Sequence, residues 1–201
     1  KPAAIQDSIV VKKKATEQNH LLVAFPSITD RDPRKYQMQL LSSILGGGMS
    51  SRLFQQVREQ QGLCYSIYSY GAGHADTGVF CIYTALNRDT EAKALATIRQ
   101  VVDQLRDQGP TSEELERARE LSKANVLMGL ESTQSRMSAL GRGTLLQDRA
   151  LTTDEVIAAY DAVTAEDVRD LAGELFDFQR ASLSVVGRVG GEERYRSILG
   201  Q

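Results

Sequence analysis

The chain has 201 residues, 41% of them hydrophobic and 25% charged, so it can form a domain with a proper core and is too hydrophobic for wholesale disorder. Its 24 Lys and Arg against 26 Asp and Glu give a formal net charge of −2, which provides no basic field for nucleic acid. The longest apolar run, near residues 21–25, is far below the roughly 18 residues that a membrane span needs. We therefore expect neither nucleic acid nor a membrane as a partner.

Two cysteines and two histidines leave little material for a metal site. A structural zinc ion takes about four Cys or His ligands, usually in closely spaced pairs. Cys64 and Cys81 are far apart in the sequence, and His20 and His74 are isolated from each other. The inverted H-x-x-E-H signature of one class of zinc peptidase is absent. The sequence therefore predicts no metal ligand in this chain.

The start of the chain and its thiols bear on where the protein resides. The first residue is Lys1 rather than Met, and no signal-peptide stretch follows it, so we expect a segment of a longer protein. Cys64 and Cys81 are predicted to be small buried thiols, at most neighbours across a hairpin, as is usual in a reducing compartment. These features favour a cytoplasmic location.

In the amino-terminal half, apolar and β-branched runs indicate strands, and glycines end the helices. Proline has no N–H for a ladder bond, so Pro26 ends the second strand. The predicted elements are strands at residues 8–11 and 19–25, a helix opened by Asp32-Pro33 and stopped by the glycines 46–48, a helix from Ser50-Ser51 to Gly62, and hairpin strands at 63–70 and 78–86.

In the carboxy-terminal half, capping boxes mark three helix starts. The boxes pair Thr111 with Glu114, Thr152 with Glu155, and Thr164 with Asp167. The predicted elements are a helix from Asp89 to Gly109, helices from 111 to about 130 and over 134–147, two short helices after the later boxes, and a strand at 181–186 that returns to the first sheet. This order predicts an α+β fold, a mostly antiparallel sheet packed against a layer of helices, in a single domain over residues 1–201.

The glycines at residues 46–48 could grip a phosphate with their amides at the start of the next helix. Neither the Lys-Ser/Thr of a P-loop nor a G-x-G-x-x-G motif after a strand accompanies them, so we interpret them as a tight turn. His20 is expected to be a satisfied imidazole within its strand, and His74 a solvated loop residue. Residues 113–120 are predicted to form a solvated helix face.

Arg58 and Tyr65 form a second candidate site. Arg58 lies in the last turn of a predicted helix, Gly62 reverses the chain, and Tyr65 stands on the strand that follows. This arrangement could bring the guanidinium and the phenol together as rigid donors for a carbonyl or a carboxylate. Alternatively, Arg58 complements the negative end of its helix and Tyr65 fills a half-buried position in the sheet. Spacing alone leaves both interpretations open.

One stretch of sequence is familiar: Leu-Gly-Gly-Gly-Met-Ser-Ser-Arg-Leu-Phe at residues 45–54, followed by Gly-Leu-Cys-Tyr-Ser at 62–66. It resembles the insulinase/pitrilysin-type zinc peptidases, the inverzincins, which include the mitochondrial processing peptidase subunits. The resemblance implies the LuxS/processing-peptidase-like metallohydrolase fold, with two homologous halves around a peptide chamber. The amino-terminal half of such proteins holds zinc through H-x-x-E-H and a downstream Glu. Because this chain lacks the motif, it resembles the carboxy-terminal, non-catalytic half.

The resemblance also implies a role for the candidate pair. In two-half members, an Arg and a Tyr of the second half reach towards the bound peptide, and Arg58 and Tyr65 match their spacing. We therefore expect these two residues to bind substrate, and no catalytic residue or metal ligand in this chain. Zinc and the general base are expected in a homologous half, in the same polypeptide or a separate subunit, where the peptide adds as a strand to a sheet edge.

Two alternatives remain open at this stage. The first is a scaffold subunit that has lost proteolysis, as the core subunits of a respiratory complex have. The second is a module that binds peptides without any enzyme. A homodimer of the chain is also compatible with the resemblance.

Overall fold

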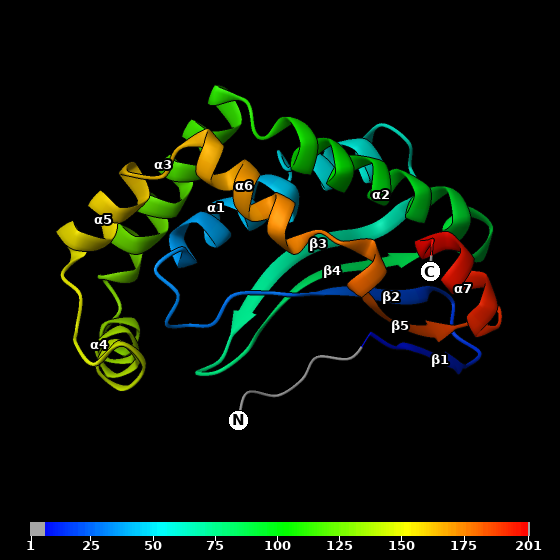
Figure 1. Cartoon of the computed structure of the whole chain (residues 1–201), viewed down its shortest axis with the longest axis horizontal. Coiled ribbons are helices and arrows are strands. Elements are labelled where there is room, and N and C mark those ends of the chain that lie inside the picture. Colours follow the sequence, from blue (N-terminus) through cyan, green and yellow to red (C-terminus); the bar gives the residue numbers. More distant parts are fainter. Residues whose placement is uncertain (1–6, 201) are drawn as a thin grey trace.

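The computed structural model describes residues 7–200, which form one five-stranded sheet with helices packed on one of its faces (Figure 1). The strands are β1 (Ile9–Lys13), β2 (Asn19–Pro26), β3 (Cys64–Gly73), β4 (Gly78–Leu86) and β5 (Ser182–Gly187). Their order in the sheet is β1-β5-β2-β4-β3. Only β1 and β5 run parallel among these neighbours, which confirms the predicted α+β fold with a mostly antiparallel sheet.

The helices follow the predicted order with one addition. They are α1 (Lys35–Gly46), the π-helix η1 (Phe54–Glu59), the 3₁₀ turn η2 (Arg88–Thr90), α2 (Glu91–Gln108), α3 (Ser112–Gly129), α4 (Thr133–Gln147), α5 (Thr153–Asp161), α6 (Ala165–Leu175), the 3₁₀ turn η3 (Phe178–Arg180) and α7 (Glu192–Leu199). All three capping boxes are formed. The terminal helix α7 was not predicted. No helix within residues 7–200 has the length and apolar character to cross a membrane.

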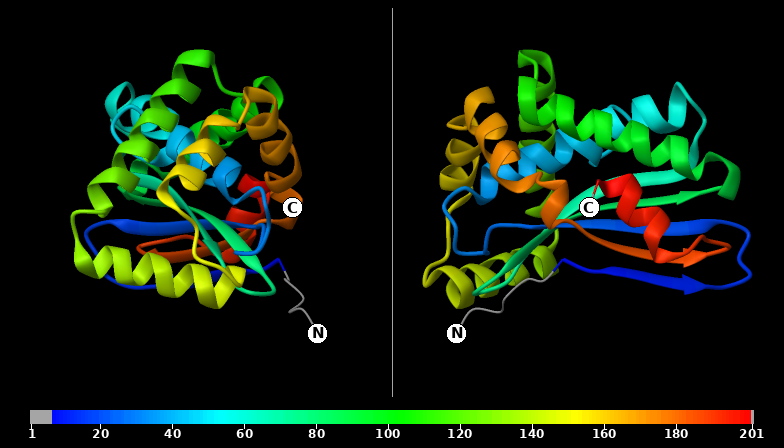
Figure 2. Two further views of the ribbon diagram at one scale, coloured as in Figure 1. Left: turned by 90° about the vertical axis from the view of Figure 1, so that its left-hand side faces the viewer. Right: turned by 45° about the vertical axis from the view of Figure 1, so that its right-hand side comes forward.

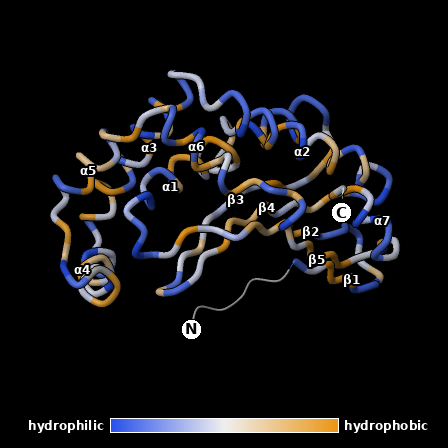
Figure 3. The backbone as a smooth tube through the Cα atoms, in the orientation of Figure 1, coloured by the Kyte–Doolittle hydropathy of each residue, from blue (hydrophilic) through white to orange (hydrophobic). Residues whose placement is uncertain are grey.

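The core lies between the sheet and the helices (Figure 2). At its centre Phe25, Phe80 and Phe176 meet edge to face, with ring centroids 5.3 Å and 5.2 Å apart for Phe25–Phe176 and Phe80–Phe176. The central strands are apolar along most of their length (Figure 3). The opposite face of the sheet carries no helix among the described residues, so its strands lie open on that side.

The first glycine of the triplet allows α1 to approach β3 closely. A Cβ atom at Gly46 would lie 2.5 Å from the backbone N of Ser69, closer than side chains tolerate. The Ser42 hydroxyl donates to the Ser69 carbonyl across the same contact, at 3.2 Å. Gly46 is therefore required by helix–sheet packing, whereas a Cβ at Gly48 would meet nothing within 4 Å. The triplet forms the predicted turn between two helices.

Arg52, in the same motif, ties this turn to the capping box of α3. Its guanidinium donates to both Glu114 carboxylate oxygens at 2.7 Å and to the Gly109 carbonyl at 2.9 Å. Burial alone would raise the pKa of the Glu114 carboxyl, but hydrogen bonds from Arg52 and from the Thr111 backbone outweigh it and hold this pKa below its usual value. Glu114 is therefore a structural residue rather than part of a solvated face.

We expect Arg52→Ala to lower the free energy of unfolding by about 2 kcal/mol near neutral pH, because it removes charge-assisted hydrogen bonds that are mostly shielded from water. Since the folded state lowers the pKa of Glu114, this stabilisation is fully present above the ordinary value of 4.5 and is lost as the pH falls through the folded value. Urea denaturation at several pH values should therefore show that the free energies of unfolding of the variant and the parent differ less at acidic pH than at neutral pH. As a control, Arg117→Ala removes an exposed ion pair with Glu113 on α3, the helix that carries Glu114. It should change the free energy of unfolding by less than about 0.5 kcal/mol.

Candidate functional site

Arg58 and Tyr65 lie together where the chain passes from η1 into β3. The Arg58 Cζ atom is 4.7 Å from the ring centroid of Phe54 and 5.9 Å from that of Tyr65. Both distances are within the range of cation–π attraction, which holds the guanidinium between the two rings. The helix, turn and strand thus bring the two predicted residues to one place.

The helix that carries Arg58 is a π-helix rather than an α-helix. The Gln60 N–H donates to the Gln55 carbonyl, five residues earlier, at 2.9 Å. At the start of this helix the Ser51 hydroxyl donates to the Gly48 carbonyl at 2.6 Å. π-Helical turns are rare and occur frequently at functional sites.

Gly62 makes the reversal after the helix. Its φ of +60° is in the left-handed region that glycine adopts without strain. The Gly62 N–H donates to the Arg58 carbonyl at 2.9 Å, and the Leu63 N–H donates to the Val57 carbonyl at 3.0 Å. Each of these hydrogen bonds spans one residue more than its counterpart in a Schellman motif, as a π-helical end requires, and together they fix the exit angle of the chain and hence the start of β3.

Tyr65 stands at a break in the β3–β4 ladder. Cys64 pairs with Leu86 and Ser66 pairs with Ala85, so Tyr65 is the extra residue of a β-bulge. Its side chain is 71% exposed. Bulges re-aim a side chain out of the regular alternation of a strand, and they are common beside functional sites.

Beyond the cation–π contacts, neither polar group of the pair has a hydrogen-bond or ion-pair partner in the described part of the chain. No carboxylate of residues 7–200 lies within ion-pair distance of Arg58, and the Tyr65 hydroxyl makes no hydrogen bond there. A guanidinium and a phenol in this position can donate to an oxygen atom supplied by a ligand. The geometry is therefore suited to a carbonyl or a carboxylate.

The histidines and cysteines do not assemble a metal site. His20 Nδ1 lies 2.7 Å from the Tyr83 hydroxyl, as expected for a satisfied imidazole, and His74 is exposed in the hairpin loop. No group of three His, Cys, Asp or Glu within residues 7–200 could hold a metal ion. The donor set does not fit zinc.

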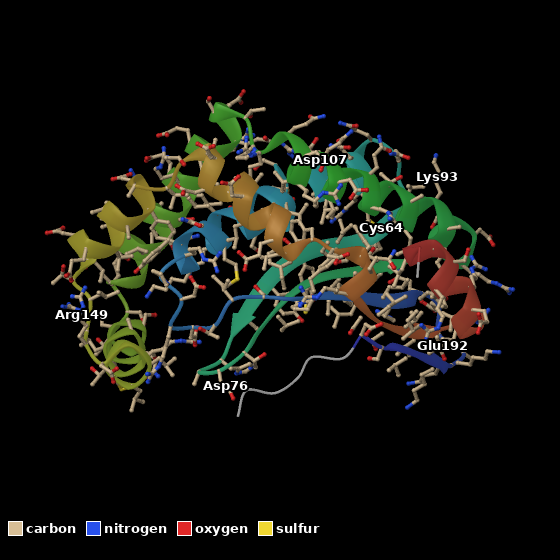
Figure 4. The ribbon with its side chains drawn as sticks, viewed as in Figure 1. Cys64, Asp76, Lys93, Asp107, Arg149 and Glu192 are labelled. Atoms are coloured by element: carbon tan, nitrogen blue, oxygen red, sulfur yellow. The ribbon has the colours of Figure 1, made fainter. Side chains whose placement is uncertain are left out.

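Cys64 and Cys81 are free and buried, but they are not neighbours across the hairpin. Cys64 pairs with Leu86 and lies on the helix-covered side at the start of β3 (Figure 4), whereas Cys81 pairs with Tyr70 further along the ladder. The hairpin loop, where Gly73 pairs with Gly78, sets the register that places Cys81 opposite Tyr70 and well away from Cys64. Burial raises the pKa of both thiols.

A groove of about 990 Å³ lies at the far end of the hairpin, between its tip and helices α1, α4 and α5. Tyr36, Tyr160 and Val156 form part of its apolar lining, and Arg142 reaches across it to Asp30 at 3.2 Å. Arg58 and Tyr65 do not line it. The candidate site is thus an open surface rather than a cavity.

Sequence comparison decides the family. A profile described as the peptidase M16 inactive domain matches residues 1–122, more than half of the chain. The chain belongs to the peptidase M16 inactive-domain family. This membership confirms the resemblance to insulinase-type zinc peptidases and to their non-catalytic part.

Relatives of this M16 inactive domain bear names that fit the assignment. An uncharacterized zinc protease of Bacillus subtilis is 40% identical over 90% of the chain and 44% of its own length. A second one, of Streptomyces coelicolor, is 36% identical over 91% of the chain and 40% of its own length. The chain therefore spans less than half the length of these relatives.

Solved structures show the same fold. A peptidase M16 inactive domain from Pseudomonas fluorescens superposes with a TM-score of 0.83 at 23% identity, over 93% of this chain and 44% of that one. A protease from Helicobacter pylori superposes with a TM-score of 0.81 at 19% identity, over 91% of this chain and 44% of that one. At these identities the likeness establishes the fold alone.

Proposed function

We propose that this M16 inactive domain, residues 1–201 acting as one domain, forms one wall of the peptide chamber of a zinc-dependent endopeptidase. The zinc ion and the general base come from a homologous half, in the same polypeptide or in a separate subunit. Three observations support the proposal: the family match, the zinc protease names of the relatives, and the length of the relatives beyond this chain.

The observation that carries the proposal is the pairing of Arg58 with Tyr65. Both groups are donors, and neither has a hydrogen-bond or ion-pair partner within residues 7–200. In this role they bind the carbonyl oxygen of the peptide that is being cleaved. As negative charge develops on that oxygen, the hydrogen bonds from the guanidinium and the phenol strengthen, which lowers the barrier. The zinc of the other half supplies the Lewis acid and activates the attacking water.

The uncovered face of the sheet supports the chamber role. Tyr68 and Tyr70, neighbours on β3, are 44% and 40% exposed. Contiguous apolar side chains on an open surface mark contacts with other molecules. In a chamber wall these apolar side chains are covered, because a bound peptide and the opposite half enclose the face.

A scaffold role is the second candidate, since a chain of complex III from Candida albicans has the same fold, with a TM-score of 0.81 over 96% of this chain and 49% of that one. At 17% identity this likeness speaks for the fold only. The third candidate, a peptide-binding module without an enzyme, would use the same Arg58–Tyr65 pair. The zinc protease names of more similar relatives favour the peptidase.

The test is zinc-dependent cleavage by the complete protein that contains this chain. We expect that protein to hydrolyse a quenched fluorescent peptide library and to lose this activity after chelation of zinc. The isolated 201-residue chain should neither bind zinc nor cleave, because its donor set offers no metal site. A zinc-loaded complete protein without peptidase activity would favour the scaffold, and activity of the isolated chain would contradict the proposal.

A further inference from the structure

A cluster of aromatic side chains occupies one end of the uncovered face. Tyr68 pairs directly with Tyr83 across β3 and β4, and their ring centroids are 4.9 Å apart. The rings of Tyr70 and His20 lie 6.1 Å from Tyr68 and from Tyr83, respectively. Three strands thus contribute to one continuous aromatic surface, which we call the tyrosine platform (Tyr68, Tyr70, Tyr83 and His20).

Cross-strand pairing holds the rings of the platform in place but leaves one hydroxyl group and part of the ring surface free. The Tyr83 hydroxyl is held by His20 Nδ1 at 2.7 Å. The Tyr68 hydroxyl, by contrast, has no partner in the described part of the chain, and 44% of this side chain is exposed. Aromatic pairs across strands stabilise a sheet. That role does not require the side chains of Tyr68 and Tyr70 to be exposed on a face that no helix covers.

The strands present no acidic side chain on the face that carries the platform. In strands β1 to β5 the residues that alternate to this side are aliphatic, aromatic, hydroxyl-bearing, thiol-bearing or cationic, and none is Asp or Glu. Lys12 is the cation on its far edge, and Arg58 lies over the ring of Tyr65, on the strand that also carries Tyr68. A surface of this kind attracts carboxylates, and it has no carboxylate of its own to pair with the Lys or Arg side chains of a basic peptide.

The platform and the Arg58–Tyr65 site share strand β3. Tyr65 and Tyr68 belong to the same strand, about 10 Å apart along it, which equals the length of about three extended residues. A peptide whose carbonyl is held by Arg58 and Tyr65 therefore carries a side chain about three positions away over the platform. Aromatic rings stack on tyrosines with their flat or edge faces, and the free hydroxyl can hydrogen-bond to the peptide backbone.

We propose that the tyrosine platform is a specificity subsite for peptides in which an aromatic residue stands next to an acidic one. This inference rests on the proposed function, because it places the peptide at Arg58 and Tyr65. The aromatic side chain packs on Tyr68 and Tyr83, and the neighbouring carboxylate is drawn to a face whose strands carry Lys12 and no Asp or Glu.

The experiment measures peptide binding to the complete protein. Four series of fluorescent peptides share one sequence except for a dipeptide, which is Glu-Phe, Glu-Ala, Lys-Phe or Lys-Ala. Within each series the dipeptide is moved along the peptide one position at a time. Binding is recorded by fluorescence anisotropy after zinc is removed, so that cleavage does not interfere. At one position we expect Glu-Phe to bind about tenfold more tightly than Glu-Ala, the usual value of a partly buried apolar contact, and more tightly than Lys-Phe. Raising the salt concentration should reduce the Glu-over-Lys preference and leave the Phe-over-Ala preference unchanged.

Variants of the complete protein locate the subsite. Tyr68→Ala should reduce the Phe-over-Ala preference to less than about twofold, and Tyr68→Phe should keep it, because the ring remains. Ser184→Glu, at an exposed position of the same face, should weaken the Glu-over-Lys preference. Val10→Ala, on β1 at the opposite edge, is the matched control and should leave both preferences intact.

Three outcomes overturn the inference. Equal binding of the four peptide series would remove the subsite, and so would an unchanged Phe-over-Ala preference in Tyr68→Ala. A Tyr68→Ala protein that no longer assembles with its zinc-bearing half, as judged by size-exclusion chromatography, would assign the platform to contact between halves. Zinc-dependent cleavage of the same peptides is read separately, so failure of the proposed function is distinguishable from failure of the subsite.

Discussion

Arg58→Ala in the complete protein is expected to lower kcat/KM for peptide cleavage by about a hundredfold or more, the usual effect of removing one donor to a developing oxyanion. The loss should fall mainly on kcat, because the hydrogen bond strengthens as charge develops on the peptide oxygen. Folding should be unaffected, since no ion pair within residues 7–200 depends on Arg58. Steady-state kinetics with a quenched fluorescent peptide provides the measurement.

Three further variants sharpen this test. Arg58→Lys keeps the charge but not the planar fork, so it should restore only part of the activity. Tyr65→Phe isolates the contribution of the hydroxyl, and Arg136→Ala removes an exposed arginine of α4 as a control. If kcat/KM is unchanged in Arg58→Ala, the role assigned to the Arg58–Tyr65 pair is wrong.

Glu91→Ala is expected to lower the free energy of unfolding by about 3 kcal/mol, because Glu91 is a buried carboxylate with three partners. It is 1% exposed and accepts hydrogen bonds from Asn19 at 2.7 Å and from Tyr195 at 3.0 Å. Arg194 adds an ion pair at 3.3 Å. Removing the carboxylate leaves the Tyr195 hydroxyl without its acceptor, and it leaves the Asn19 amide with only the longer hydrogen bond, of 3.5 Å, to the Arg188 carbonyl.

Urea denaturation measures this effect as a shift in the midpoint at constant m. Glu193→Ala, an exposed position of α7, is the matched control and should change stability by less than about 0.5 kcal/mol. Glu91→Gln retains an acceptor for Tyr195, so its loss of unfolding free energy should lie between those of Glu193→Ala and Glu91→Ala. A loss below about 1 kcal/mol in Glu91→Ala would show that the network around the start of α2 is not a major source of stability.

Local signals in the sequence predicted most of the fold. Each threonine capping box lies where its helix begins, and the strands around Pro26 and the hairpin follow the apolar pattern. The missed helix α7 had usable signals, namely Gly191 before two acidic residues and Tyr195 and Leu199 at helical spacing. It was overlooked because the segment is short and rich in charge.

The candidate site was predicted only in part. The helix, turn and strand around Gly62 identified Arg58 and Tyr65 as neighbours, since that geometry is local. The tyrosine platform depends on the pairing of Tyr68 with Tyr83 and on the place of β2 beside β4, and strand order is a long-range property. The Glu91 network likewise joins residues from both ends of the chain, so no spacing rule could reveal it.

The π-helix and the β-bulge are both departures of one residue from regular geometry, and they lie on either side of Gly62. Each residue of an α-helix adds about 100° of rotation, and each residue of a strand reverses the side to which its neighbours point. A single insertion or deletion between Phe54 and Ser66 would therefore turn the guanidinium away from the phenol, whereas many substitutions there would not. The length of this segment, more than its composition, is what natural variation has to preserve.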